Sequence, residues 1–460
     1  MEVNDILIIA MFLTFIGLLF TGYPIAFVLG GVAMIFGGIA YLSDLYLGTI
    51  TGIDFMYLGM VVNRIYKLMD NWVLVAVPMF IYMGLMLDRS GIAEKMMKSM
   101  QELFGKVRGG LAVTVTVIGI ILAASTGIIG ASVVLLGLLS VPAMLKQGYA
   151  KPLALGTVCG AGTLGILIPP SIMLVIMADQ LGLSVGDLFM GAVFPGIILG
   201  SMYIAFILLY CFLRPKNAPL PDDLRPVRPR MLWEVFKTIL PTAALIIAVL
   251  GSIFAGITTP TEASGVGALG ATLLAVWNKR FNFKVLKEVL YAAFNTTAYI
   301  FGIFIGATCF ALVLRGLGGD EFIERALTGL PLGPYGVIAV ILGCVFLLGF
   351  FLDWIEITLI ILPLLAPVVS GLGIEIPAKI DNPELVWFAV LVAVSLQTSF
   401  LTPPVGFAIF YLKGIAPPEV VLLDIYKGVV PFIILQLLGL LVVAIWPQLV
   451  VWLPSIAYGG

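Results

Sequence analysis

The chain alternates long apolar stretches with short polar ones, and the lengths of the apolar stretches predict membrane-spanning helices. An apolar run of roughly 17–25 residues can cross the hydrocarbon core of a bilayer as a helix. Runs of this kind predict helices over residues 6–21, 25–42, 71–88, 152–180, 187–213, 236–257, 263–278, 288–314, 334–352, 385–412 and 430–453. Of the 460 residues, 61% are hydrophobic and 11% are charged, whereas soluble domains carry about 25% charged residues. We therefore expect an all-α integral membrane protein.

The basic residues predict which ends of these helices face the cytoplasm. Lys and Arg gather in the segments 89–108, 214–237 and 279–287, which are cytoplasmic by the positive-inside rule. Few occur in the segments 181–187, 257–262 and 372–384, which we place on the other face. Residues 90–108 and 318–331 have the apolar spacing of amphipathic helices, one basic and one acidic. They predict two interfacial arms on opposite faces, although ordinary connecting loops are the alternative.

Two pairs of shorter apolar segments predict helical hairpins, residues 111–124 with 128–145 and residues 334–352 with 355–371. The turn of the first hairpin, "LAASTGIIGAS" (Leu122–Ser132), holds hydroxyls and glycines but no charge. A turn exposed to water would normally carry Asp, Asn or Lys. We therefore expect this turn to lie within the membrane or the protein interior.

The two halves of the chain resemble each other around two diprolines. The segment Gly162–Ile176 resembles Gln397–Tyr411, with the diproline at 169–170 falling on that at 403–404. Upstream, Ser132 precedes Pro142 by ten residues, as Asp353 precedes Pro363. Because the charge bias starts the two hairpins from opposite faces, the sequence predicts an inverted repeat with two re-entrant hairpins and two diproline-broken helices.

A broken helix within a membrane is typical of a transport site. A diproline removes two backbone donors and disfavours helix before it, so such a break is tolerated only where it lines a cavity or is buried in protein. Inverted repeats with broken helices form the substrate and ion sites of secondary transporters. The alternative for either half alone is a kinked packing helix with Ser and Gly at close contacts. The residues that we expect to bind substrate are Ser125, Thr126, Gly127, Ser132, Pro170, Ser171, Thr398 and Thr402.

The second hairpin carries two acidic residues in an apolar run, Asp353 and Glu356. An ionisable residue in such a run is a functional candidate, because burying a charge in the membrane is costly. We expect Asp353 to bind Na⁺ or to tune a nearby Na⁺ site, with a proton carrier as the alternative. Glu356 either joins this site or faces the membrane interface.

The other residue types of the chain argue against several classes of function. There is no histidine and the net charge is −1, so neither a histidine base nor nucleic-acid binding is expected. The four cysteines lie in apolar stretches without paired spacing and are expected to be small buried residues: Cys159, Cys211, Cys309 and Cys344. No Ser/Lys, paired-Asp or metal constellation suggests an enzyme. Across both hairpins and both broken helices, basic residues occur only near the ends: Lys146, Lys151, Lys379 and Lys413. A carboxylate substrate would then be held by N–H groups, hydroxyls and the bound Na⁺.

Several motifs resemble those of one transporter family. They are "GYAKPLALGTVCGAGTLGILIPPSIMLVI", "FPGIILG", "ITTPTEASGVGAL", "LDWIEITLIILPLLAPV" and "FLTPPVGFAIF". Across nearly its whole length the chain is similar to the large membrane subunit of tripartite ATP-independent periplasmic (TRAP) transporters. The segments "AASTGIIGAS" and "LDWIEIT" resemble the mannitol and chloroaromatic branch, although many family members read "GSA" and "MDP" there.

This resemblance implies an elevator-type transporter of the bacterial inner membrane, coupled to at least two Na⁺ ions and without an organic cofactor. It implies two partners, a small four-helix membrane subunit and a periplasmic substrate-binding protein, and we expect a small 2-oxo or 2-hydroxy carboxylate such as pyruvate or lactate. Carried over by position, the residues implied for Na⁺ are Ser125, Gly130, Gly160, Gly165, Asp353, Thr398, Ser399 and Pro403. A stand-alone elevator-type Na⁺/carboxylate or anion permease is the alternative, and a passive channel is a more distant one.

The expected domain organisation follows the repeat. Residues 111–186 and 334–413 form the two halves of a mobile transport domain. Residues 89–110 and 315–333 are the amphipathic arms. The scaffold comprises residues 1–88, residues 187–314 with the cytoplasmic loops 214–237 and 279–287, and the C-terminal helix in 414–460.

Overall fold

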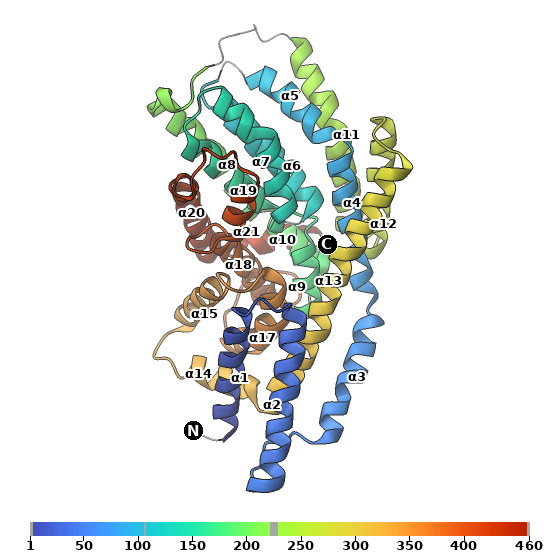
Figure 1. Cartoon of the computed structure of the whole chain (residues 1–460), viewed down its shortest axis with the longest axis vertical. Helices are drawn as coiled ribbons and strands as arrows, with labels where there is room; N and C mark the ends of the chain where they lie inside the picture. The colour runs from blue at the N-terminus through green and yellow to red at the C-terminus, as the bar shows by residue number, and fades with distance from the viewer. Residues whose placement is uncertain (1–2, 105–106, 128, 221–228, 458–460) are drawn as a thin grey trace.

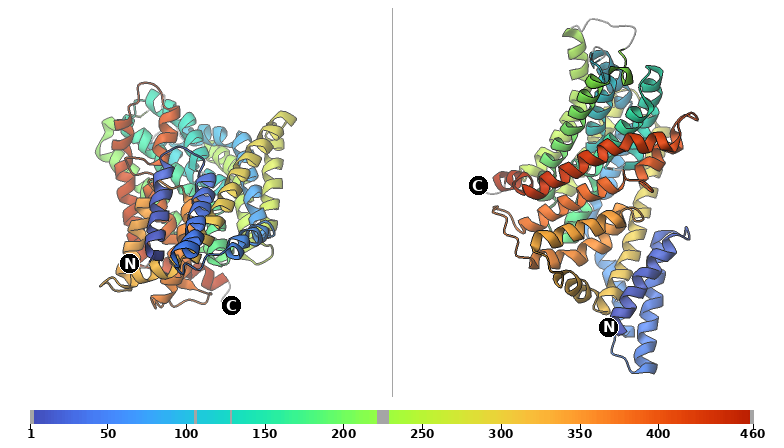
Figure 2. Two further views of the ribbon diagram at one scale, coloured as in Figure 1. Left: turned by 60° about the horizontal axis from the view of Figure 1, so that its bottom comes forward. Right: turned by 90° about the vertical axis from the view of Figure 1, so that its left-hand side faces the viewer.

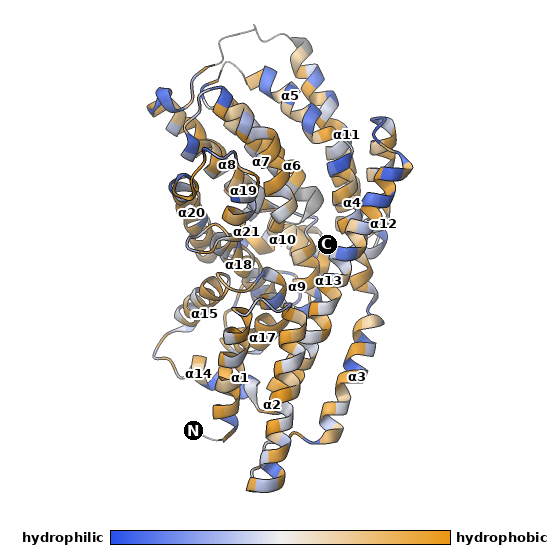
Figure 3. Ribbon diagram, in the orientation of Figure 1, coloured by the Kyte–Doolittle hydropathy of each residue, from blue (hydrophilic) through white to orange (hydrophobic). Residues whose placement is uncertain are grey.

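The computed structural model describes residues 3–104, 107–127, 129–220 and 229–457. The side chains of residues 123–126, 229 and 230 lie outside the described part. Within it, every regular element is a helix, and eight helices are long and apolar enough to cross a membrane (Figure 1). Figure 3 shows hydrophobic residues along most of these helices, with hydrophilic ones gathered at helix ends and on α5 (Ile92–Phe104). The prediction of an all-α membrane protein is confirmed.

The first half of the chain contains the helices that run up to and through the first diproline. They are α1 (Val3–Leu19), α2 (Ile25–Leu47), α3 (Phe55–Met69), the 3₁₀ turn η1 (Trp72–Val75), α4 (Ala76–Arg89), α5, α6 (Gly110–Thr126), α7 (Ile129–Lys146), α8 (Lys151–Thr163), the 3₁₀ turn η2 (Leu164–Ile166), α9 (Ile172–Leu181) and α10 (Val185–Leu213).

The second half repeats this order after two connecting helices. Its elements are the short turn η3 (Pro215–Asn217), α11 (Pro229–Phe254), α12 (Pro260–Trp277), α13 (Phe283–Gly316), α14 (Gly319–Thr328), α15 (Pro334–Leu348), α16 (Trp354–Glu356), the π turn η4 (Ile357–Ile361), α17 (Leu362–Gly371), α18 (Pro383–Ser399), α19 (Phe407–Ile415), α20 (Leu422–Ile445) and α21 (Gln448–Ala457).

Equivalent helices of the two halves make equivalent contacts, in agreement with the sequence repeat. We define hairpin 1 as α6 and α7, and hairpin 2 as α15 with α16, η4 and α17. Helices α6 and α7 both pack on α8, as α15 and α17 pack on α18. Helix α20 packs on α8, and α10 packs on α18, so each half is closed by the last long helix of the other. The arm α5 lies near the top of the long axis of the molecule, whereas α14 lies in its lower part, below α15 (Figure 1).

The remaining helices form a layer beside the two hairpins. Helix α2 packs on α13, α12 packs on α4, and α4 packs on α13, which joins the N-terminal and central helices. The three views place α1–α3 at one end of this layer and α11 at the other (Figures 1 and 2). Within this layer, α4 contacts α9 and α6 of hairpin 1, α11 also contacts α6, and α13 contacts α16 and η4 of hairpin 2.

Three local features differ from the expectations drawn from the pattern. Residues 55–69 form a helix that was not predicted, because its polar positions interrupt the apolar run. The prediction of one helix over 430–453 is wrong, because the chain breaks between α20 and α21 at Pro447, which cannot donate a backbone hydrogen bond. The second arm of hairpin 2 widens into the π turn η4 just before Pro363, whose ring displaces the regular helical bond.

Helices α8 and α20 meet at two glycines that allow their backbones to touch. A Cβ atom on Gly156 would collide with the carbonyl of Gly428, and one on Gly428 would collide with the carbonyl of Pro152. A side chain at either position would therefore force the helices apart. This contact joins the first broken helix to the last long helix of the chain.

We predict that Gly428→Ala destabilises the protein, because a methyl group here meets backbone atoms that cannot move aside. Overpacking of a protein interior costs about 1–3 kcal/mol. The measurement is thermal unfolding of the purified protein in detergent, with Gly251→Ala as the control, since a Cβ on Gly251 meets no atom within 4 Å. Equal melting temperatures for the two variants would contradict the proposed backbone contact.

Candidate functional site

Both diprolines interrupt their helices in the same way. Each contains a cis bond, Pro169–Pro170 in break 1 (residues 164–171) and Pro403–Pro404 in break 2 (residues 400–406). In break 1 the Ser171 hydroxyl donates a hydrogen bond to the carbonyl of Ile166, at 2.7 Å. In break 2 the backbone turns through Gly406, whose φ of 51° suits glycine. Break 1 is almost entirely buried, whereas Pro403 is partly exposed and Pro404 is exposed.

The two breaks and the two hairpins meet because the halves cross. Helix α9, which follows break 1, packs on η4 and α17 of hairpin 2. Helix α19, which follows break 2, packs on α7 of hairpin 1. Helix α18 also contacts η2 and α9. Each hairpin thus contacts both the broken helix of its own half and the segment after the break of the other half.

The turn of hairpin 1 approaches break 1 through glycine. Gly127 has a φ of 59°, and a Cβ atom on it would lie 3.0 Å from the backbone nitrogen of Ile172. Gly130, three residues later, lies against the ring of Tyr411 on α19. Ser132 is buried on α7, with 1% of its surface exposed. The side chains of Ser125 and Thr126, both expected to bind substrate, lie outside the described part.

The turn of hairpin 2 approaches break 2 in the same manner. A Cβ atom on Gly349 would collide with the Oγ atom of Ser399, the last residue of α18. Asp353 caps α16, and its Oδ1 accepts a hydrogen bond from the backbone nitrogen of Trp354 at 2.8 Å. Glu356 is fully buried, and neither of its carboxylate oxygens has a hydrogen-bond partner among the described residues. A buried carboxylate without donors needs a cation or a proton to compensate its charge.

Three hydroxyls lie at this junction, two at the end of α18 and one in break 2. Those of Thr398, Ser399 and Thr402 donate hydrogen bonds to carbonyls of α18, those of Val394, Leu396 and Thr398, at 2.7–2.8 Å. Each hydroxyl therefore keeps its oxygen lone pairs for a ligand. Thr398 and Ser399 are fully buried, whereas Thr402 is partly exposed.

Of the residues expected to bind ligands in the first half, some lie at break 1 and one lies in the packing between helices. Pro170 and Ser171 are buried next to Ile172, the residue that the turn of hairpin 1 approaches, and Gly165 is buried in η2. Gly160 instead lies on α8 against the ring of Phe432 on α20, and its carbonyl accepts the Thr163 hydroxyl at 3.0 Å. This places Gly160 in the packing between α8 and α20.

Two tyrosines at the junction were not singled out from the sequence. Tyr411 lies over Gly130 and within electrostatic range of Asp353. Tyr299 on α13 lies within electrostatic range of Asp353, Glu356 and Tyr411. Tyr411 is the last residue of the repeated segment after the second diproline, and this position in the repeat could have identified it from the sequence. Nothing in the local pattern of α13 distinguishes Tyr299.

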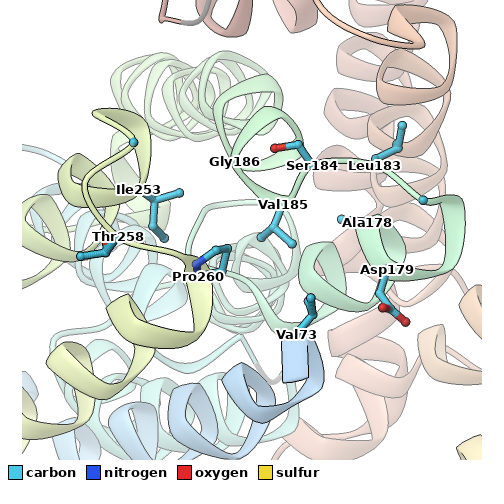
Figure 4. Close-up of a pocket in the computed structure, with 12 residues that line it drawn as sticks. Val73, Ala178, Asp179, Leu183, Ser184, Val185, Gly186, Ile253, Thr258 and Pro260 are labelled. Atoms are coloured by element: carbon cyan, nitrogen blue, oxygen red, sulfur yellow. The ribbon is translucent and has the colours of Figure 1, made fainter. Parts of the chain in front are cut away.

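A separate cavity of about 400 Å³ lies at the far end of α9 (Figure 4). Its walls are η1, the α9–α10 turn and the α11–α12 connection, with Val73, Ser184 and Pro260 among the lining residues. Asp179 at its edge accepts a hydrogen bond from Asn71 at 2.6 Å. Since α9 has ten residues, this cavity lies about 15 Å along the helix from break 1.

Residues 12–449 match the protein family described as "Tripartite ATP-independent periplasmic transporter, DctM component". The chain belongs to this family. The resemblance drawn from the motifs is confirmed, and the protein is a permease and not an enzyme. Permeases of this family take up substrate together with a periplasmic binding protein and a small membrane subunit. This permease is a multi-pass protein of the bacterial inner membrane.

Curated relatives match over nearly the entire chain. The C4-dicarboxylate TRAP transporter large permease protein DctM of Vibrio cholerae is 28% identical, and the alignment covers 98% of both chains. The sialic acid TRAP transporter large permease protein SiaM of the same species is 28% identical, over 96% of this permease and 97% of the relative. Among solved structures, the YdaH transporter of Alcanivorax borkumensis has a TM-score of 0.59 at 13% identity, over 91% of this permease and 98% of that chain. The last similarity concerns the fold alone.

We predict that Gly349→Ala loosens hairpin 2, because the added methyl group collides with the Ser399 side chain. Overpacking of this kind costs about 1–3 kcal/mol. Ser399→Gly removes the colliding atoms, so the double variant should be more stable than Gly349→Ala alone, as thermal unfolding would measure. Gly343→Ala on α15 is the control, since a Cβ there meets nothing within 4 Å. Strictly additive effects of the two substitutions would rule out the contact.

Proposed function

We propose that this permease takes up a small 2-oxo or 2-hydroxy carboxylate together with Na⁺ by an elevator mechanism. The observation that carries the proposal is the acidic pair at the turn of hairpin 2. Glu356 is fully buried without hydrogen-bond donors among the described residues, and Asp353 lies three residues before it. Hard carboxylate oxygens suit a hard cation, so Na⁺ is the ion that compensates this charge and is carried with the substrate.

The carboxylate of the substrate needs donors that are not cationic side chains. The ammonium groups of Lys151 and Lys413 are engaged, since they donate hydrogen bonds to the carbonyls of Glu419 and Val420 in the α19–α20 connection. The remaining donors are the backbone N–H groups at the start of α9 and at the hairpin turns. The hydroxyls of Ser171, Thr398, Ser399 and Thr402 already donate to carbonyls, so they offer lone pairs to Na⁺. A helix N-terminus attracts an anion through its free N–H groups and dipole. Bound Na⁺ supplies the positive charge that the protein lacks there.

A small α-oxygenated acid fits this donor set. Its second oxygen, next to the carboxylate, can meet hydroxyls or Na⁺ that the carboxylate does not reach. The two curated relatives described above carry the names of acids, C4-dicarboxylates and sialic acid. Their names support an acidic substrate and differ in size, so the 2-oxo or 2-hydroxy class is proposed from the donors.

The elevator proposal follows from the division of the packing. The hairpins, the broken helices, α10 and α20 pack on one another through α8 and α18, whereas α2, α3, α4, α12 and α13 form their own layer. We propose that the first group moves as one body, the transport body, against the second, the scaffold. An organic anion entering a cell works against the membrane potential by about 2.3 kcal/mol per charge per 100 mV. More than one Na⁺ per monoanion reverses this sign.

We predict that Asp353→Asn and Glu356→Gln each raise the Na⁺ concentration for half-maximal uptake by about tenfold, because each removes one charge-assisted ligand worth about 1.5–3 kcal/mol. The assay uses the permease with its small membrane subunit in liposomes and the binding protein outside, and follows labelled pyruvate with and without an inward Na⁺ gradient. Glu375→Gln is the matched control, since Glu375 is exposed in the α17–α18 connection.

Each outcome of this assay has a distinct meaning. Uptake that needs Na⁺ and the binding protein, with weakened Na⁺ dependence in the two variants, supports the proposal. Uptake by the permease alone would indicate a stand-alone permease, and unsaturable flux without a gradient would indicate a channel. Na⁺-independent uptake at unchanged affinity would refute the coupling.

A further inference from the structure

A small polar cavity lies between the scaffold and hairpin 2, outside the site described above. It has a volume of about 120 Å³ and is lined by residues of α3, α9, α13, η4 and α17. Arg64 of α3 and Arg315 of α13 line it together, beside Gln180 of α9 and Thr308 of α13. Since a water molecule occupies about 30 Å³, the cavity holds about four. This is room for a carboxylate with a short chain.

The packing of α3 on α13 holds the two guanidinium groups at this cavity. The hydroxyl of Tyr57 on α3 donates a hydrogen bond to the carbonyl of Leu312 on α13, at 3.0 Å. Gly316 lies against the ring of the same tyrosine, where a Cβ atom would collide with it. The two helices therefore meet closely about two turns from Arg64 and within one turn of Arg315.

The two charged side chains that line the cavity, Arg64 and Arg315, are both positive. Arg315 pairs with Asp320 through its Nε, at 3.3 Å, so its Nη groups are not part of that ion pair. Arg64 has no ion pair with the described residues at the distance that defines one. The nearby carboxylates are already engaged, Asp320 by Arg315 and Asp179 by Gln180, so the guanidinium of Arg64 is available to an anion in the cavity. Guanidinium groups bind carboxylates through two parallel hydrogen bonds, and they remain charged at all relevant pH values.

The position of the cavity connects it with transport. Arg64 and Arg315 belong to scaffold helices, whereas Gln180, Leu359 and Pro363 belong to the transport body. A ligand in the cavity therefore touches both bodies. Movement of one body against the other would open this cavity and release the ligand.

We propose that Arg64 and Arg315 form an anion-binding site that takes the carboxylate of the substrate before it reaches the hairpin turns. This inference rests on the proposed function in naming the substrate as the ligand. It supplies cationic side chains, which in the hairpins and broken helices occur only near the ends. The transfer then runs from arginines on the scaffold to hydroxyls, N–H groups and Na⁺ on the transport body.

The first arm of the test measures the charge preference of the cavity without transport. The four native cysteines are replaced by Ser, Thr308→Cys is introduced, and labelling by an anionic methanethiosulfonate (a sulfonate) is compared with labelling by a cationic one (a quaternary ammonium) in phosphatidylcholine nanodiscs. We expect the anionic reagent to react about fivefold faster, because a positively charged cavity concentrates anions. Pyruvate should slow the reaction, and both effects should disappear on adding Arg64→Gln and Arg315→Gln.

The second arm measures uptake of labelled pyruvate by the otherwise unaltered permease with its partners. Arg64→Gln should raise the KM for pyruvate about tenfold, equivalent to about 1.4 kcal/mol, while leaving its Na⁺ dependence unchanged. Arg64→Lys keeps the charge and should preserve anion preference, which guards against a variant that merely misfolds. Lys67→Gln is the matched control, since Lys67 lies on the same helix, is exposed and does not line the cavity.

The two arms separate the site from the proposed function. Equal labelling by both reagents, or labelling that pyruvate does not slow, would overturn the site even if Na⁺-coupled pyruvate uptake occurs. Anion preference with pyruvate protection supports the site even where uptake proves independent of Na⁺. An equal rise in KM for Arg64→Gln and Lys67→Gln would overturn the role of the cavity, since a general loss of surface charge would explain both.

Discussion

A helix interrupted within a membrane must satisfy its backbone from the protein itself, and the rest of this structure depends on that constraint. The diproline of each half removes two donors, and lipid offers no replacement. Each break is covered by the turn of the hairpin from its own half. The coverage is close because glycine lies at the point of contact, Gly127 against Ile172 in the first half and Gly349 against Ser399 in the second. The hairpins are therefore required by the breaks, and neither would be stable in lipid without the other.

The crossing of the two halves follows from the same requirement. The helix after each break packs on the hairpin of the other half, so neither half completes the junction alone. The backbone contact between Gly156 and Gly428 then joins the first broken helix to α20. These contacts tie hairpins, broken helices and the last long helix of each half into one unit. This unit, and not either repeat, is the smallest part of the permease that can contain the site.

The sequence predicted the parts of this fold that local physics determines. The diprolines, the uncharged hairpin turn and the spacing of Asp353 from Pro363 act within a few residues, and they located the hairpins and breaks within a few positions of the observed ends. The contacts of Tyr299 and Gly160 are made with residues distant from them in the sequence, so no local pattern predicts these contacts. Helix α3 was missed for a related reason. Helix α3 has no buried residue. Its polar positions include Arg64, which lines the cavity only because α13 packs beside α3.

The charges at the two proposed sites determine the order in which Na⁺ and the substrate bind at the hairpin turns. Acidic groups lie at the hairpin turn, with Glu356 fully buried, whereas the cavity with Arg64 lies at the scaffold. A carboxylate leaving two guanidinium groups for a site that already holds two acids would move toward like charge, which is unfavourable at low dielectric. The move becomes favourable only when Na⁺ has compensated the acids. In the proposed mechanism Na⁺ binding must therefore precede substrate transfer, and the separation of the arginines from the hairpins is what makes coupling obligatory. Arginines at the hairpin turns would hold the anion without Na⁺ and would uncouple the two.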